Sequence, residues 1–251
     1  MKLKKKVDLL LGKDFFRKLF ISEMSQQDIQ SMGMLSSLLP NKLYNPMTSY
    51  TLSPTTIVHI LNEIILLKRK TIVEFGSGVS TLFIARLLSY HKLNATLFSI
   101  DHEKKWQNVL QSSLDTEGTG ANVKLICAGL ESSKGFENQE CRWYSKSLLG
   151  KKLPEKIDLV IVDGPPFSTG QYSRYFAVPF LKNRLLDDYS IFLDDVFRKG
   201  ESDILNAWEN ILGVNPINYI RYAVFTTNNK VSTVPISLSY NYKYDELIKI
   251  K

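Results

Sequence analysis

The sequence lacks several features that would assign it to a specialised class of protein. Its longest uninterrupted apolar runs, such as Leu159–Val162, fall far short of the roughly 18 residues that a membrane-spanning helix needs. It has only two cysteines in 251 residues, too few for a disulfide framework, so we expect Cys127 and Cys141 to be reduced thiols in a cytoplasmic protein. Its 44% hydrophobic and 23% charged residues exclude disorder as the main state. These limits leave a soluble globular chain with one large domain, or one domain and an appendage.

The net charge of +7 is concentrated at the start of the chain. Residues 1–20 hold seven bases and two acids, which gives +5, so residues 21–251 carry 25 − 23 = +2. A nearly neutral body argues against a nucleic-acid partner. Lys13 and Asp14 interrupt the first apolar stretch too early for a signal peptide, so we expect the leader to be uncleaved. Two alternatives remain for residues 1–20: a basic amphipathic helix on an anionic membrane surface, or an arm that packs on the domain or on a second subunit.

Helical periodicity dominates the first part of the chain. Apolar residues recur at helical spacing over residues 5–39 and stop before Pro40, which predicts one or two amphipathic helices. Residues 44–52 show no clear period and predict a loop. Ser53-Pro54 places a capping hydroxyl before a first-turn proline, which predicts that a helix begins there and runs to residue 67. We therefore expect a helical appendage over residues 1–43 and a domain over residues 44–251.

From residue 71 onward, short apolar runs alternate with helical segments. Strands are expected at residues 71–75, 96–100, 123–127, 157–162 and 190–193, and helices at residues 80–90, 104–114, 175–186 and 202–212. Strands that alternate with helices predict a parallel sheet with helices on both faces. Two β-rich runs, residues 217–226 and 230–238, are joined by Thr227-Asn228-Asn229 and predict a hairpin. The expected fold is an α/β, Rossmann-like, doubly wound sheet with five parallel strands and a C-terminal antiparallel hairpin, seven strands in all, preceded by helices.

Ligands of an open α/β sheet bind outside the carboxyl ends of the strands, so the turns there carry the functional candidates. The first turn reads Glu74-Phe-Gly-Ser-Gly-Val-Ser-Thr81, and its two glycines let the backbone approach a ligand closely. Thr81 stands where a dinucleotide fingerprint has a third glycine, and the lysine of a phosphate-binding P-loop is missing. Asp101 ends the second strand 23 residues after Gly78, close to the spacing of a carboxylate that binds ribose. An ordinary helix cap explains Asp101 equally well.

Four segments together resemble the class I S-adenosylmethionine-dependent methyltransferases, and especially bacterial methyltransferase-domain families whose first motif reads Glu-Phe-Gly-Ser-Gly-x-Ser-Thr. The segments are residues 74–81, 99–102, 158–166 and 193–198, and the resemblance covers about residues 44–240. It implies that Gly76, Ser77 and Gly78 contact the methionine part of the cofactor while Glu74 holds its ammonium group. It also implies that Asp101 binds the ribose and that His102 lies beside the adenine. The remaining cofactor-site residues that it implies are Ser80, Thr81, Gly129, Leu130 and Asp163.

Three carboxylates follow the fourth and fifth strands. Asp163 directly precedes the rigid turn Gly164-Pro165-Pro166, and Asp194 and Asp195 follow the next strand. Carboxylates on adjacent strand ends repel one another unless they share a cation or a proton. Metal-dependent small-molecule O-methyltransferases, which these positions resemble, bind magnesium there, so the resemblance implies Mg²⁺ or another divalent cation at Asp163, Asp194 and Asp195. Arg174 and Arg198 lie just beyond, where each either binds an acceptor's carboxylate or phosphate or pairs with the aspartates.

The resemblance implies in-line methyl transfer, and we expect the acceptor to be a hydroxyl of a small molecule or glycan. Asp163 or Asp195 would act as the base, directly or through a divalent ion, with Arg198 as a third catalytic candidate. Gly164 separates Asp163 from the two prolines, which interrupts the Asn/Asp-Pro-Pro-aromatic turn of amino-methylating enzymes and disfavours N-methylation. The rival hypotheses are a nicotinamide-dependent oxidoreductase and a non-catalytic scaffold with the cofactor fold. Residues 44–52 and the N-terminal helices are expected to cover the site and select the acceptor, and Tyr144 either closes the cofactor pocket or packs in the core.

Overall fold

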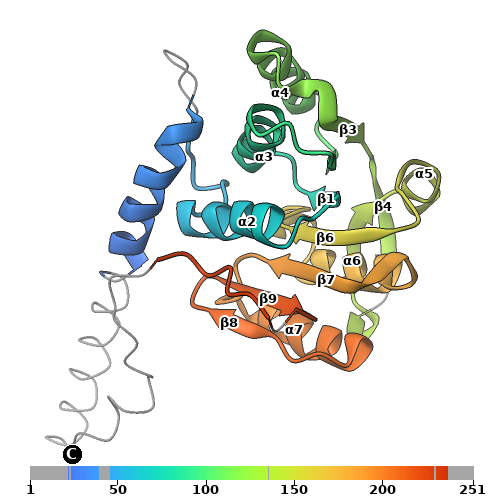
Figure 1. Ribbon diagram of the computed structural model, residues 1–251. Coiled ribbons are helices and arrows are strands. Elements are labelled where there is room, and N and C mark those ends of the chain that lie inside the picture. Colours follow the sequence, from blue (N-terminus) through green and yellow to red (C-terminus); the bar gives the residue numbers. More distant parts are fainter. Residues whose placement is uncertain (1–21, 23, 40–45, 135, 229, 237–251) are drawn as a thin grey trace, which may run out of the picture.

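A computed structural model describes residues 22, 24–39, 46–134, 136–228 and 230–236. At its centre is a seven-stranded sheet in the order β3-β2-β1-β6-β7-β9-β8 (Figure 1). The strands are β1 (Thr71–Phe75), β2 (Thr96–Asp101), β3 (Val123–Cys127), β6 (Ile157–Val162), β7 (Leu185–Leu193), β8 (Ile217–Tyr219) and β9 (Tyr222–Thr226). The first five pair in parallel, whereas β9 runs antiparallel to both β7 and β8. The predicted fold class is confirmed.

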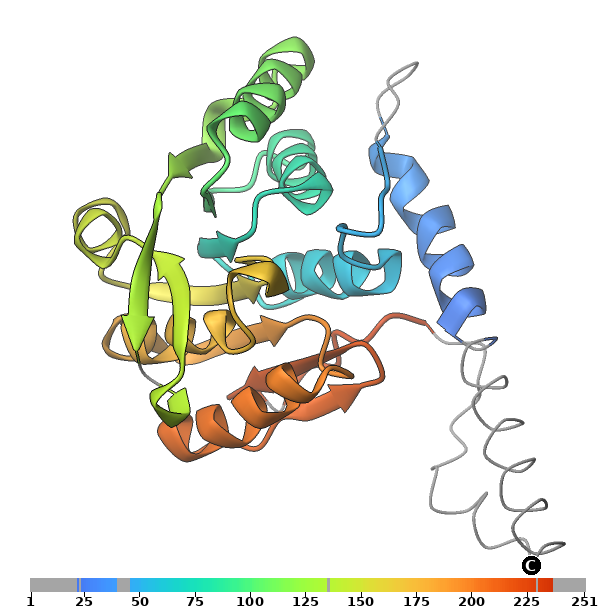
Figure 2. The ribbon, with the colours of Figure 1, turned by 180° about the vertical axis from the view of Figure 1, so that it is seen from behind.

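Helices cover both faces of the sheet (Figures 1 and 2). The helices are α2 (Pro54–Leu66), α3 (Val79–Tyr90), α4 (Lys104–Glu117), α5 (Lys146–Lys152), α6 (Ala177–Leu181) and α7 (Lys199–Leu212). The buried side chains form two main hydrophobic cores, and neighbouring residues of an inner strand belong to different ones. Ile72 of β1 packs with α2 and α3, whereas its neighbour Val73 packs with α6 and α7. Every residue of β6 is buried, which explains the unbroken apolar run Leu159–Val162, and the one acid of the strand, Asp158, accepts backbone hydrogen bonds from Lys70 and Thr71.

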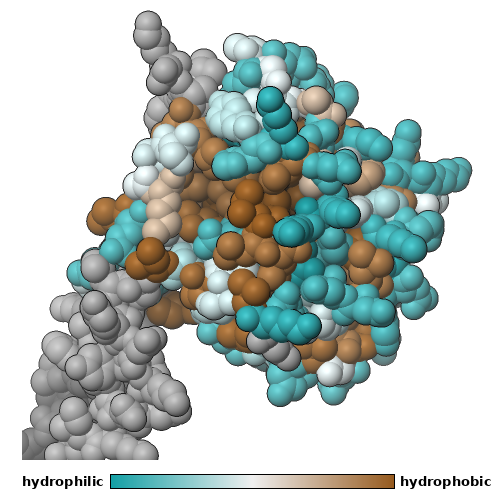
Figure 3. Space-filling view, viewed as in Figure 1, coloured by the Kyte–Doolittle hydropathy of each residue, from teal (hydrophilic) through white to brown (hydrophobic). Residues whose placement is uncertain are grey.

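The N-terminal residues that the structure describes pack against the domain. A helix over residues 24–35 leads into a short 3-10 turn, and Leu35 and Leu38 belong to the same core as α2. Asp28 accepts hydrogen bonds from the backbone nitrogen and the hydroxyl of Thr55, at 3.2 and 2.7 Å. The expected leader helix over residues 1–20 lies outside the described residues, so its membrane or protein contact and the division at residue 43 stay predictions. On the face seen in Figure 3, apolar side chains gather over α2, where Ile65 and Leu66 are exposed.

Two expected elements have different boundaries in the structure. The helix predicted over residues 175–186 is a series of short turns around α6, and β7 already begins at Leu185. Pro179 lies inside α6 and cannot donate a backbone hydrogen bond, which opposes a long regular helix there. The strand predicted over residues 190–193 is correspondingly longer at its start.

The predicted C-terminal hairpin is present, but its position was wrong. Both of its strands lie within the first β-rich run, because the chain turns at Ile220-Arg221. Residues 230–236 form no strand. Asn228 instead accepts backbone hydrogen bonds from Lys230 and Val231 through its side-chain oxygen. This local turn replaces the strand ladder that the sequence pattern suggested.

A second hairpin was not predicted at all. Strands β4 (Leu130–Lys134) and β5 (Glu140–Tyr144) pair antiparallel as a separate two-stranded sheet inserted between β3 and β6. β5 buries Cys141, Trp143 and Tyr144 against the main sheet. Cys127 and Cys141 are free thiols. Within the described residues, no helix is long and apolar enough to cross a membrane.

Candidate active site

A cavity of about 610 Å³ lies at the carboxyl ends of β1, β2, β6 and β7. This is the sheet edge at which the sequence placed the functional turns. The structure brings most of the predicted site residues together here, namely Gly76, Ser77, Gly78, Ser80, Asp101, His102, Asp163, Asp195 and Arg198. Glu74, Thr81, Gly129, Leu130 and Asp194 do not line the cavity.

The glycine loop forms the floor of the cavity. Gly76 has a φ of +95°, and a Cβ atom there would lie 2.8 Å from the backbone nitrogen of Gly164. Its own nitrogen donates to the carbonyl of Ile100 at 2.8 Å. A side chain at position 76 would therefore separate the loop after β1 from the turn after β6. The tight approach of these two backbones positions both walls of the site.

Glu74 lies beneath the glycine loop and is fully buried. Its carboxylate accepts hydrogen bonds from the hydroxyls of Ser80, Thr81 and Ser99, at 2.5, 2.5 and 2.7 Å. Burial raises the pKa of the Glu74 carboxyl, and the three hydroxyls oppose that rise. Because its oxygens are occupied from below the loop, the structure assigns Glu74 a supporting position instead of a direct contact with an ammonium group.

Thr81 explains why a third glycine is not needed in this loop. Its hydroxyl donates to Glu74 and accepts a hydrogen bond from the backbone nitrogen of Gly78 at 2.9 Å. That nitrogen is at the start of α3, where backbone donors have no partner within the helix. The threonine thus caps the helix and fixes the loop at the same time.

Asp101 lies where the loop after β2 meets the cavity. Its carboxylate accepts backbone hydrogen bonds from Glu103 at 2.8 Å, just before α4, and from Ser77 at 3.2 Å. It also lines the cavity, and burial raises the pKa of its carboxyl. His102 lies next to it, with Nδ1 3.3 Å from Asp101 Oδ1. Asp101 therefore holds a local turn before α4 without capping that helix, and its contact with a ribose stays a prediction.

One further residue of this half was not singled out from the sequence. Trp106 lines the cavity, and its indole nitrogen donates to the carbonyl of Ser77 at 2.7 Å. Its place one turn into the helix that follows Asp101 was the available signal. Gly129 has its carbonyl bonded to the backbone nitrogen of Ser145, at 2.9 Å, and begins the unpredicted hairpin. That hairpin carries Tyr144 into the cavity wall.

The second half of the cavity holds the aspartate cluster, defined as Asp163, Asp194 and Asp195. One carboxylate oxygen from each lies within 4.8 Å of the others. Burial raises the pKa of Asp163 well above its usual range, and the other two carboxylates add to the rise. Burial also raises the pKa of Asp194. Asp195 has a φ of +62°, a conformation uncommon for a residue other than glycine.

Three arginines, Arg174, Arg198 and Arg221, surround the aspartate cluster. Arg174 is 5% exposed and bridges two aspartates, with 3.1 Å to Asp163 and 3.3 Å to Asp195. Arg198 lies 2.7 Å from Asp195, and Arg221, which the sequence gave no reason to select, lies 3.2 Å from Asp194. Ion pairing with the aspartates, one of the two alternatives for Arg174 and Arg198, is thus what the structure shows.

The arginines bear directly on the expected divalent ion. Three oxygens within 4.8 Å would suit a cation, but the Arg174 guanidinium already bridges two of the three carboxylates. Within the described residues the aspartate cluster is therefore neutralised by arginines, and a divalent ion at these three carboxylates stays a prediction.

The loop before α2 forms the rim. Pro46 and residues 48–52 line the cavity, in agreement with the expectation that the loop covers the site. Tyr50 is 86% exposed there, and Phe167, which also lines the cavity, is half exposed. Arg221 ties the loop to the aspartate cluster by donating to the carbonyl of Thr51 at 3.0 Å.

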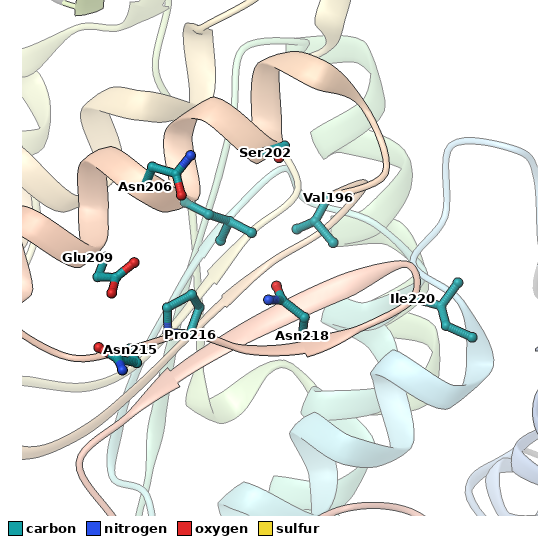
Figure 4. A pocket seen from close by; sticks show the side chains of 9 residues that line it. Val196, Ser202, Asn206, Glu209, Asn215, Pro216, Asn218 and Ile220 are labelled. Atoms are coloured by element: carbon teal, nitrogen blue, oxygen red, sulfur yellow. The ribbon is translucent and has the colours of Figure 1, made fainter. Parts of the chain in front are cut away.

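A second hollow of about 540 Å³ lies between α7 and the segment that contains β8. Figure 4 shows Asn206 and Glu209 of α7 on one side of it, with Asn215, Pro216 and Asn218 from β8 and the preceding loop on the other. Asp195 and Arg221 line the first cavity, and their neighbours in the sequence, Val196 and Ile220, line the second. We call the second hollow the amide groove.

Comparisons with known proteins agree with this geometry. A family model described as a methyltransferase domain matches residues 73–196. A Staphylococcus aureus protein assigned as a caffeoyl-CoA O-methyltransferase shares the fold with a TM-score of 0.53 at 12% identity, over 86% of this chain and 99% of its own. Methyltransferase PaMTH1 of Podospora anserina, bound to S-adenosylhomocysteine, gives 0.52 at 15% identity, over 80% and 87%. An O-methyltransferase of Bacillus cereus, also in complex with S-adenosylhomocysteine, gives 0.52 at 12% identity, over 80% and 90%.

No curated protein sequence matches the chain. At these identities the solved structures establish the shared fold alone. Together with the family model, which covers the glycine loop, Asp101 and the aspartate cluster, they support a class I S-adenosylmethionine-dependent methyltransferase.

Proposed function

We propose that this protein transfers a methyl group from S-adenosylmethionine to a hydroxyl of a small-molecule or glycan acceptor. One observation carries the proposal: the glycine loop and Asp101 share a single cavity of about 610 Å³ with Asp163 and Asp195. A site for the cofactor and a site for proton removal are therefore contiguous. The comparisons support the methyltransferase class, and the chemistry of the lining residues supports the hydroxyl acceptor.

The cofactor half is formed by the loop after β1 and by Asp101. Gly76, Ser77 and Gly78 would contact the methionine part, because the loop has no side chain beyond a hydroxymethyl group to keep a ligand away. Asp101 would accept hydrogen bonds from the ribose hydroxyls, and His102 and Trp106 would border the base. The bound cofactor supplies an electrophilic methyl group on its sulfonium.

The acceptor half is formed by the aspartate cluster and its arginines. Asp163 is the proposed base, because burial holds its pKa well above the usual carboxyl range and so makes it a better proton acceptor. A positioned base contributes about 10²–10⁴-fold, and alignment of the two reactants contributes up to about 7–11 kcal/mol. Arg174 fixes the Asp163 carboxylate from one side. Because Gly164 stands between Asp163 and Pro165, a hydroxyl is favoured over an amino acceptor.

The amide groove favours an extended, polyhydroxylated acceptor. Asn206, Asn215 and Asn218 offer both hydrogen-bond donors and acceptors without charge. Leu205 and Pro216 supply apolar surface between them. This combination suits the hydroxyls and C–H faces of a glycan.

Binding of S-adenosylhomocysteine, measured by calorimetry, tests the cofactor half. We expect micromolar binding by the wild type and at least about 10-fold weaker binding by Asp101→Asn, since hydrogen bonds to a charged group are worth about 1.5–3 kcal/mol. Asp115→Asn, on the exposed face of α4, is the matched control and should bind normally. A wild type that binds NADH instead would support the oxidoreductase, and one that binds neither ligand would support the scaffold.

Transfer of labelled methyl from S-adenosylmethionine to a panel of glycans and phenols tests the acceptor half. Asp163→Asn should lower kcat by about 10²–10⁴-fold on any accepted substrate while S-adenosylhomocysteine affinity stays within a few-fold. Activity that survives EDTA and does not rise with magnesium would agree with the arginine-neutralised cluster. Activity that requires a divalent ion would instead restore the metal-dependent mechanism.

A further inference from the structure

Tyr144 places a buried, unpartnered hydroxyl in the wall of the cavity. Its side chain, at the end of β5, is 1% exposed and stacks on Phe75 with ring centroids 5.7 Å apart. The residue lines the cavity. Among the described residues its hydroxyl has no hydrogen-bond partner. Buried hydroxyls are nearly always hydrogen-bonded, so this one points to a partner that the protein chain does not supply.

The Tyr144 hydroxyl occupies the space that a side chain on residue 164 would fill. Any side chain at position 164 would clash with the Tyr144 hydroxyl, and a Cβ there would also lie 2.9 Å from the nitrogen of Gly76. The hydroxyl therefore lies at the meeting point of the glycine loop and the turn after β6. Glycine at position 164 keeps this point open.

The charges around the hydroxyl indicate what it can do there. Burial raises the pKa of Tyr144 well above its usual value, and the carboxylates of Asp101, Asp163 and Glu74 raise it further, against Arg174. The phenol is thus neutral and retains its proton for donation. The hydroxyl lies beside the backbone of Gly76 in the glycine loop, because a Cβ on Gly164 would meet both of them. This position puts the hydroxyl in the cofactor half of the cavity, and Asp101, the proposed ribose-binding residue, is the carboxylate that raises its pKa most.

We propose that the Tyr144 hydroxyl donates a hydrogen bond to a ribose oxygen of the bound cofactor. The proposal rests on the proposed function and adds a specific contact to it. The hairpin of β4 and β5, inserted after β3, is then part of the cofactor site, because it brings this donor to the cavity that Asp101 also lines. Ligand binding supplies the acceptor that the phenol lacks in the protein alone.

This role predicts opposite effects on stability and on binding. Tyr144→Phe removes no hydrogen bond within the protein, so thermal stability without ligand should be unchanged or slightly raised. Binding should weaken, because the ligand then loses a partner. Tyr222→Phe is the matched control: Tyr222 is also buried, but its hydroxyl lies 2.8 Å from Nδ1 of His59 and it does not line the cavity. That variant should melt earlier and bind the ligand normally.

The experiment measures thermal midpoints and calorimetric affinities for S-adenosylhomocysteine and for methylthioadenosine, which keeps the ribose and lacks the amino-acid group. For Tyr144→Phe we expect both affinities to fall by about 3- to 10-fold, the range of one net hydrogen bond. Unchanged affinity for both ligands overturns the contact. A loss confined to S-adenosylhomocysteine overturns the assignment to the ribose. Failure of the wild type to bind either ligand overturns the proposed function itself, a result distinct from any difference between the variants.

Discussion

Replacing Arg174 by leucine should destabilise the protein through the acids that it now neutralises. Its guanidinium lies 3.1 Å from Asp163, 3.3 Å from Asp195 and 3.9 Å from Glu201. At an effective dielectric constant of about 20, each contact corresponds to about 4–5 kcal/mol of Coulomb attraction. Desolvation of the buried groups offsets most of this attraction. Removing one partner of a buried pair nevertheless costs about 3–5 kcal/mol, because the other charge stays buried, and we expect Arg174→Leu to lose that much.

The loss should depend on pH in a defined direction. The pKa of Asp163 is already raised by burial, and Arg174 is the first of the groups that oppose the rise. Without the arginine, the folded-state pKa of Asp163 rises further above its unfolded value. The folded state then binds a proton that the unfolded state releases, so the penalty grows as pH rises from about 4 toward the new folded pKa. The stability difference from wild type should be larger at pH 8 than at pH 5.

Urea unfolding at both pH values measures this difference. Lys134→Gln is the control, because Lys134 pairs with Glu140 on the surface, where both side chains are largely exposed, and such pairs contribute about 0–1 kcal/mol. A loss for Arg174→Leu below about 1 kcal/mol at pH 8, or an equal loss at both pH values, would refute the idea that this arginine neutralises the buried acids.

Two further predictions concern stability. Gly76→Ala should lower the free energy of unfolding by more than about 2 kcal/mol and abolish S-adenosylhomocysteine binding, because position 76 combines a φ of +95° with a backbone contact at 2.8 Å. The control is Gly33→Ala, in a helix with open space around it, which should raise the free energy of unfolding by about 1 kcal/mol. Equal effects of the two substitutions in urea unfolding would contradict the steric argument. Burial lowers the pKa of His59 from 6.5 to about 4, so the unfolded state binds more protons between these values and stability falls on acidification. Relative to His59→Gln, the wild type should lose about 3 kcal/mol more between pH 7.5 and pH 4. The exposed His91→Gln variant should follow the wild type, and parallel stability curves for wild type and His59→Gln would exclude this role for His59.

Local sequence patterns determined much of the fold and of the site. Mainly apolar runs, such as residues 159–162, indicated buried strands, and each was followed by a turn with glycine or aspartate. Because parallel strands end at one edge of a sheet, Gly76, Asp101 and Asp163 could be assigned to one site before any contact was known. The Ser53-Pro54 start of α2 was equally local, since Ser53 accepts from the backbone nitrogen of Thr56 at 3.2 Å.

Contacts between distant parts of the chain decided the rest. From the sequence, Glu74 could either contact a ligand or support the glycine loop from below. The three hydroxyls that donate to its carboxylate, which only the tertiary structure reveals, distinguish these two outcomes. Arg221 was hidden in a β-rich run, yet the turn at Ile220-Arg221 carries it to Asp194, 27 residues earlier.

The short hairpin of β4 and β5 gave too weak a periodic signal to predict, although it brings Tyr144 to the glycine loop. The sequence by itself therefore determined the alternation of strands and helices and the sheet edge at which the candidate residues lie. Spacing along the chain fixes which residues follow a strand. Only the tertiary structure decided which side chains face the cavity and which cations neutralise its acids, because burial and ion pairing depend on neighbours that spacing along the chain does not specify.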